Sequence, residues 1–147
     1  MSTTPIQSSS DQSENRSLGG IFVHVLALFT SFVGPAIMYA ISDHEFTREN
    51  ARNAINWHIT VIILAVTAFV TGFLGADEVT INGEPTELLA VPSPLDTVFT
   101  FIGIPLLLAV VVAVFATFGF AVVATQKAAS GSAWSYPGSI SLIEWFR

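Results

Sequence analysis

The stretch that decides the fold is residues 98–125, VFTFIGIPLLLAVVVAVFATFGFAVVAT, which holds 28 residues and no formal charge. At about 1.5 Å per residue, a helix of this length exceeds the roughly 30 Å of a bilayer's hydrocarbon core. A segment in lipid must satisfy its own backbone hydrogen bonds, so we expect a helix despite the many β-branched residues. The surplus length predicts a tilt, a kink at Pro105, or a start in the interface near Phe99 and Phe101.

Two further charge-free runs, residues 18–41 and 55–76, precede it. Of the 147 residues, 52% are hydrophobic and 11% are charged, and the mean hydropathy is +0.66. A soluble domain this small has too little interior for that much apolar surface, so the surplus must face lipid. We therefore expect an all-α membrane protein with three transmembrane helices in a compact bundle, spanning about 18–41, 52–76 and 98–126.

The segments outside these spans are polar or aromatic. Residues 1–17 are rich in Ser, Thr and Gln and indicate a disordered tail before a single membrane domain at 18–143. Loop 42–54 is short and charged, and loop 77–96 is acidic and holds no base. The tail at 127–147 carries aromatic residues of the kind that gather at a membrane interface, and its end, Ser139 to Arg147, fits a short interfacial helix.

Positive charges predict the orientation, because short cytoplasmic loops carry an excess of Lys and Arg. With three spans, the N-terminal tail and loop 77–96 share a side that has one base, Arg16, and seven acids. Loop 42–54 and the C-terminal tail share the other side, which holds the remaining four bases. We expect a multi-pass protein of the plasma membrane, with loop 42–54 and the C-terminus in the cytoplasm and the N-terminus and loop 77–96 outside.

The bulk composition excludes several classes of function. The chain has no cysteine, so disulfides, thiolate metal sites and cysteine nucleophiles are absent. Its net charge of −6 leaves no basic footprint for nucleic acid. An acidic exterior with a single lysine, Lys127, suits very high salt, so we hypothesise a halophilic source. Folding stability that did not rise with molar salt would contradict that hypothesis.

Each expected span carries a stripe of small residues, which let helices in lipid approach closely. Steps of three and four residues place the members of each stripe on one helix face. Such stripes would pack the helices of one chain into a compact bundle, or pack helices of different copies in a homo-oligomer. Both alternatives stay open. The three stripes are Gly20, His24, Ala27, Ser31 and Gly34; Ala68, Gly72 and Ala76; and Ala109, Ala113, Thr117, Ala121 and Thr125.

His24 and His58 are titratable groups within the expected spans. Ionisable residues at membrane depth are candidates for a functional role, while the alternative is a neutral imidazole bonded to a neighbouring helix. We expect His24 well below the outer end of its helix and His58 near the inner end of the next. Zinc ligands must all lie about 2 Å from the ion, so this separation in depth argues against a shared metal site.

Arg52, Asn56 and Thr60 recur at four-residue steps and share one face of the second expected helix. One reading is an interfacial Arg that extends to the membrane surface, with Asn56 bonded across the bundle. The other is a polar mouth that contacts a substrate or a lipid headgroup. Loop 77–96 could bind a cation, but it lacks the spacing of an EF-hand.

Motifs of catalysis and cofactor binding are missing from the sequence. It holds no G-x-S-x-G, H-E-x-x-H, Walker loop or dinucleotide fingerprint, and no span contains a carboxylate. We therefore expect no enzyme activity, no catalytic residue, no metal and no cofactor.

Three local patterns resemble one known family. They are HVLALF from His24 with Gly34-Pro35 and Tyr39, ARNAINWH over residues 51–58, and QKAASG over 126–131 followed by Tyr136-Pro137. In order and spacing they are similar to the 4870 family of domains of unknown function, small membrane proteins often grouped with Tic20-like proteins. Trp57 and His58 stand where that family has Phe and Gln. The matching positions are His24, Arg52, Ala54, Asn56, Gly131, Tyr136 and Pro137.

The resemblance implies an integral membrane protein and establishes no activity. We expect a non-enzymatic binding or assembly module whose partners are the lipid bilayer and a second copy or another membrane protein. Its working surface would combine loop 42–54, the start of the second helix and the tail around Tyr136-Pro137. The alternative is a subunit of a transporter, channel or protein-translocation complex, which would need an oligomer because three spans make a poor pore.

Overall fold

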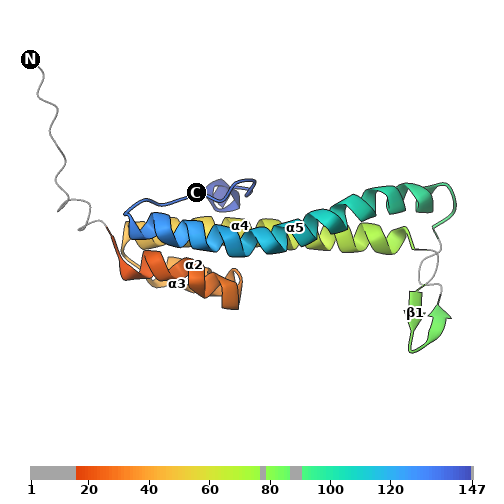
Figure 1. Cartoon of the computed structure of the whole chain (residues 1–147), viewed down its shortest axis with the longest axis horizontal. Coiled ribbons are helices and arrows are strands. Elements are labelled where there is room, and N and C mark those ends of the chain that lie inside the picture. Colours follow the sequence, from red (N-terminus) through yellow and green to blue (C-terminus); the bar gives the residue numbers. More distant parts are fainter. Residues whose placement is uncertain (1–15, 77–78, 87–90, 147) are drawn as a thin grey trace, which may run out of the picture. The chain divides into compact units, whose positions relative to one another are not determined.

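A computed structural model describes residues 16–76, 79–86 and 91–146 (Figure 1). These residues form four α-helices, a short β-hairpin and one turn of 3-10 helix, so the expected all-helical class holds. Their contacts divide into two units, one made of residues up to Thr60 and from Thr117 onward, the other of Val61–Ala116. The elements are α2 (Leu18–Thr30), α3 (Val33–Ile41), α4 (Glu45–Leu74), β1 (Val79–Ile81), β2 (Glu84–Thr86), α5 (Leu95–Ala129) and η1 (Leu142–Phe146).

The first apolar run does not form the single long helix that we expected. It is divided into α2, with 13 residues, and α3, with 9, and the two pack against each other. A Cβ placed on Gly19, at the start of α2, would lie 3.0 Å from the Cε of Met38 near the end of α3. The start of the first helix therefore lies beside the end of the second, and the two form an antiparallel helical hairpin.

Local backbone chemistry explains the reversal. Ser31, the residue after α2, has φ 54° and ψ −134°, which no α-helix contains. Pro35 has no N–H to donate to the Ser31 carbonyl, but it is tolerated in the first turn of a new helix. A Cβ on Gly34 would lie 2.7 Å from the Cγ of Leu26, so only glycine permits this approach of α3 to α2.

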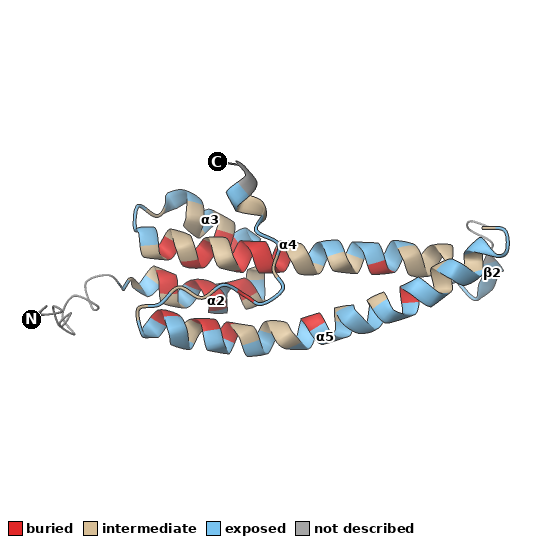
Figure 2. Ribbon diagram, turned by 90° about the horizontal axis from the view of Figure 1, so that it is seen from above, coloured by how far each residue is buried: buried red, intermediate tan, exposed pale blue. Residues whose placement is uncertain are grey.

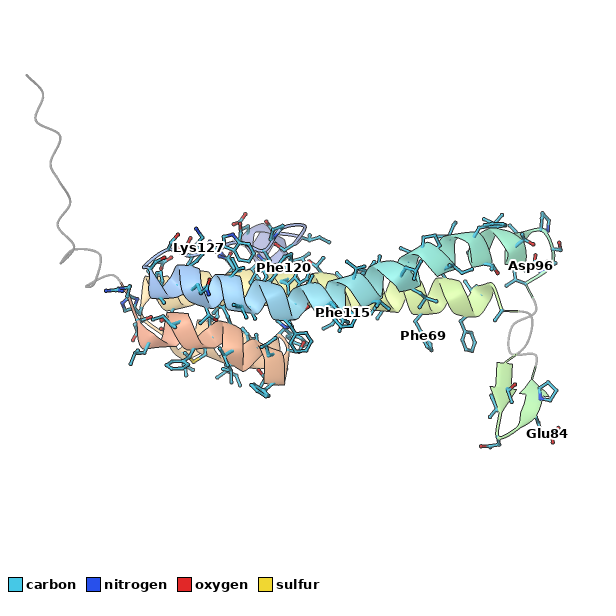
Figure 3. All side chains as sticks on the ribbon, viewed as in Figure 1. Phe69, Glu84, Asp96, Phe115, Phe120 and Lys127 are labelled. Atoms are coloured by element: carbon cyan, nitrogen blue, oxygen red, sulfur yellow. The ribbon has the colours of Figure 1, made fainter. Side chains whose placement is uncertain are left out.

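Two helices, α4 and α5, are long and apolar enough to cross a membrane. They have 30 and 35 residues, and each contains a long stretch that is almost entirely apolar. Large apolar side chains along both helices are exposed, such as Phe69 and Phe115 (Figure 3). The expected third span is not confirmed, because neither helix of the α2–α3 hairpin has the length to cross.

The core of the first unit lies where α2, the first half of α4 and the end of α5 meet (Figure 2). Small residues let these helices approach: a Cβ on Gly20 would lie 2.6 Å from the ring of Phe46. Ser17 caps α2 by accepting a hydrogen bond from the Gly20 N–H, and its hydroxyl also bonds that of Thr47. The buried small residues are Gly20, Ala27, Ala51, Ala54, Ala121, Ala124 and Ala128.

The second unit, Val61–Ala116, consists of the second half of α4, the β-hairpin and the first part of α5. A Cβ on Gly103 would lie 3.0 Å from the backbone of Gly72, so the two glycines mark a close helix contact. The Thr100 hydroxyl donates to the Gly75 carbonyl at 2.7 Å. The stripe expected around Gly72 thus serves packing within the chain.

The β-hairpin turns at Asn82-Gly83. Asn82 and Gly83 have φ values of 54° and 89°, as a tight two-residue turn requires. Val79 pairs with Thr86, and Ile81 with Glu84. Pro85 lies in β2 opposite Thr80, and the strand forms because both strands of a two-stranded sheet are edges, where proline is tolerated.

Candidate functional site

A network of buried polar groups in the first unit is centred on His24. Its Nδ1 lies 2.8 Å from the Tyr136 hydroxyl, and its Nε2 lies 2.9 Å from the Oδ1 of Asn50. His24 and Asn50 have no exposed surface, and Tyr136 is 3% exposed. The network therefore joins three segments: α2, the first part of α4 and the C-terminal tail.

The position of the protons follows from the partners. The Asn50 Nδ2 donates to the Phe46 carbonyl at 2.9 Å, so its Oδ1 must accept from the His24 Nε2–H. In a neutral imidazole the Nδ1 is then an acceptor, and the Tyr136 hydroxyl donates to it. Burial raises the pKa of Tyr136, which keeps this phenol protonated at any physiological pH.

Aromatic rings hold Tyr136 in place. Its ring stacks on Trp57, with centroids 5.8 Å apart and an interplanar angle of 11°. Trp134 and Phe120 also contact it, at centroid distances of 5.3 and 5.9 Å. The Trp57 Nε1–H donates to the Thr117 hydroxyl at 3.0 Å, so this indole also has its hydrogen bond satisfied.

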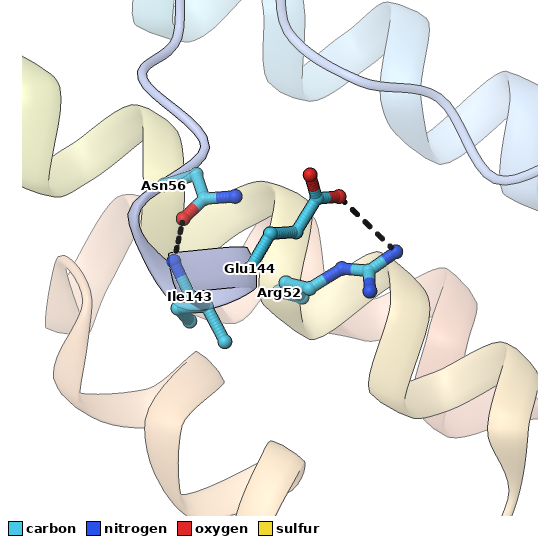
Figure 4. Close-up of polar contacts among 4 residues, drawn as sticks. All are labelled: Arg52, Asn56, Ile143 and Glu144. Carbon is cyan, nitrogen blue, oxygen red and sulfur yellow. Dashed lines mark hydrogen bonds and ion pairs between the residues drawn. The ribbon is translucent and has the colours of Figure 1, made fainter. Parts of the chain in front are cut away.

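The chain's own tail covers the polar face of α4, at Arg52 and Asn56 (Figure 4) and at Thr60. The Ile143 N–H donates to the Asn56 Oδ1 at 3.2 Å, and the Ile140 N–H donates to the Thr60 hydroxyl at 2.9 Å. An Arg52 Nη2 lies 4.0 Å from a Glu144 carboxylate oxygen, and the Arg52 Nε is buried without a partner. These contacts seat η1, where the sequence predicts an interfacial helix, on α4.

The remaining predicted positions have local roles. The Nδ1–H of His58 donates to the Ala54 carbonyl of its own helix at 2.9 Å, and this bond is separate from the His24 network. Gly131, with φ 81°, ends α5: its N–H donates to the Ala128 carbonyl, and the Ser132 N–H donates to the Lys127 carbonyl.

Pro137 is exposed and occupies a turn, with Gly138 next to it at φ 78° and the Ser139 N–H donating to the Tyr136 carbonyl. It makes no contribution to the buried network.

Asn50 is the network member that was not among the candidates from the sequence. It falls in the charged segment 42–54, ahead of the apolar part of the second helix, and α4 begins at Glu45. The available signal was helical spacing: Asn50, Ala54 and Trp57 recur at steps of four and three residues, and all three are buried.

The chemistry open to this network is limited by its own bonds. Both nitrogens of His24 and the Tyr136 hydroxyl are already paired, and no surface of His24 can be reached by a substrate. Within residues 16–76, 79–86 and 91–146, no three His, Asp or Glu side chains are grouped so as to hold a metal ion. The arrangement is therefore suited to fixing the tail and the helical hairpin on α4.

Comparison with known proteins corrects the resemblance drawn from short motifs. No curated protein and no solved structure matches the chain. The match to a family covers residues 15–143, and that family is neither the 4870 family nor a Tic20-like one. The motif positions proved too general to tell these families apart, since several serve packing, capping or a turn. The chain belongs to the MamF/MmsF family of magnetosome magnetite crystal formation proteins.

Proposed function

We propose that the chain is a non-enzymatic, membrane-embedded module of magnetite crystal formation that presents loop 77–96 to the growing mineral. The observation that carries the proposal is the charge of this loop. It contains five acids, Asp77, Glu78, Glu84, Glu87 and Asp96, and no base. Carboxylate oxygens are ligands that hard metal cations take in proteins, and the surface of an iron oxide exposes such cations.

The position of the loop in the chain supports this role. It connects α4 and α5, the two helices able to cross a membrane, so crossing by both puts the loop on the face opposite the C-terminal tail. Glu84 belongs to the β-hairpin, and Asp96 lies in the first turn of α5 (Figure 3). By the distribution of bases, this face is the non-cytoplasmic one, which in a closed vesicle is the interior.

The fully paired His24 network supports a structural module, because it offers no group for catalysis. The alternative of a transporter, channel or translocation subunit has no support in the family to which the chain belongs. The helical hairpin and the seated tail instead pack with the first part of α4 within the first unit.

The test uses the full chain in liposomes with the loop facing outward, in a solution from which magnetite is precipitated. One variant replaces the five loop acids by their amides. The control replaces three acids of the opposite face, Asp43→Asn, Glu45→Gln and Glu49→Gln.

Electron microscopy gives the distribution of crystal sizes. We expect the wild type and the control to shift that distribution relative to protein-free liposomes and the loop variant to leave it unshifted. An unchanged effect of the loop variant would overturn the proposal.

A further inference from the structure

The two ends of the α2–α3 hairpin lie at the same end of the first unit. The Ser17 hydroxyl, before α2, bonds the Thr47 hydroxyl in the first turn of α4. The Arg16 Nη1 donates to the Ala129 carbonyl at the end of α5, at 2.8 Å. The hairpin thus begins and ends beside the start of α4 and the end of α5, which lie at the same membrane face if both helices cross.

The hairpin is too short to reach the other face. At about 1.5 Å per residue, 13 residues of α2 extend about 20 Å and 9 residues of α3 about 14 Å, against a hydrocarbon core of about 30 Å. Tilting would shorten this depth further. The hairpin therefore lies mainly in a single leaflet.

Its outer surface is apolar and has no partner within the described chain. Residues 17–42 carry no formal charge. Phe29, close to the turn, is 84% exposed, and this surface also includes Phe22, Val33, Ile37 and Ile41. Such a surface at membrane depth is covered by acyl chains, because water is absent there and both polar ends stay at the headgroups.

The bases identify the leaflet. With two spans and this hairpin, all five bases (Arg16, Arg48, Arg52, Lys127 and Arg147) belong to the face from which the hairpin enters, and loop 77–96 has none. The imbalance is five to none, where three spans would give four to one. This face is therefore the cytoplasmic one.

We propose that the α2–α3 hairpin is a binding surface for the acyl chains of the cytoplasmic leaflet alone, and that it directs the protein to membranes in which this leaflet is convex. Two extra helices in one leaflet enlarge that leaflet's area. Insertion costs less where curvature has already loosened lipid packing, as it does in a convex leaflet. The cytoplasmic leaflet of a vesicle inside a cell is convex. This inference does not depend on the mineral-binding role.

The experiment measures sorting of the full chain between a giant vesicle and a narrow membrane tube pulled outward from it. The outer leaflet of the tube is convex. Since the chain has no cysteine, Ser139→Cys with an impermeant dye marks molecules whose cytoplasmic face is outside, and Gly83→Cys marks the opposite orientation. We expect the Ser139-labelled molecules to be enriched several-fold in the tube and the Gly83-labelled molecules to be depleted. Equal sorting of the two orientations, or the reverse order, would overturn the proposal.

A matched pair of variants attributes the sorting to the hairpin. Phe29→Gln places an amide at the exposed tip of the hairpin, while Phe115→Gln changes a similarly exposed ring, 73% exposed, on α5. Neither ring is part of the core, so both variants should fold. We expect Phe29→Gln to lose most of the enrichment and Phe115→Gln to keep it. Equal sorting of the Phe29 and Phe115 variants would also contradict the proposal. The variant in which the five acids of loop 77–96 are replaced by amides should sort like the wild type.

Discussion

At the scale of single residues, the fold of the first unit depends on His24. A buried imidazole is costly unless both nitrogens are bonded, and here Tyr136 and Asn50 supply both bonds from segments 112 and 26 residues away. His24 and Tyr136 were both candidates from the sequence, but nothing in the sequence paired them. Their pairing depends on the tail's return toward α4 after α5 ends at Gly131.

Removing the Tyr136 hydroxyl should destabilise the protein while leaving its ring packed. In Tyr136→Phe the Nδ1 of His24 loses its donor and stays buried, at an expected cost of about 1–3 kcal/mol in the free energy of unfolding. The matched control is Tyr39→Phe, because Tyr39 contacts Arg48 through its ring face and lies outside the network. Denaturation of both variants in the same detergent measures the difference, and equal losses would refute a role for this hydroxyl bond.

At the scale of elements, the first apolar run is where sequence and structure differ most. Its 24 charge-free residues satisfy a length criterion for a span, but length says nothing about the backbone at Ser31 and Pro35. Neither the second nor the third run contains a Gly-Pro pair, and the third run contains one proline, Pro105. The helix α5 continues past that proline from Leu95 to Ala129.

A side chain at Gly34 should separate the two helices of the hairpin. In Gly34→Val the new Cβ would meet Leu26, and the two helices must move apart or the turn must open. We expect a loss of about 1–3 kcal/mol, the usual cost of overpacking a close contact. Gly119→Val is the control, since a Cβ at Gly119 would have no atom within 4 Å. Thermal unfolding in detergent compares them, and a Gly34 variant as stable as the control would rule out the close approach.

At the scale of the whole molecule, the apolar excess and the distribution of charge were readable from the sequence. Together they predict a helical membrane protein with an acidic loop between its last two long helices. Composition did not reveal that the run at 18–41, apolar enough for a span, forms two helices of 13 and 9 residues. The net charge of −6 now has a local explanation, since the base-free loop contributes five of the eleven acids. A halophilic source stays a prediction that the stability of the protein in molar salt would test.

The proposed single-leaflet hairpin requires that the chain cross the membrane twice and that its N-terminus and C-terminus share the cytoplasmic face. Three single-cysteine variants, Ser13→Cys, Gly83→Cys and Ser139→Cys, test it in intact cells or sealed vesicles with an impermeant thiol reagent. Because the chain has no cysteine of its own, each signal reports one site. We expect Ser13→Cys and Ser139→Cys to react from the cytoplasmic face and Gly83→Cys from the opposite face. Reaction of Ser13→Cys from the same face as Gly83→Cys would show three crossings and contradict this topology.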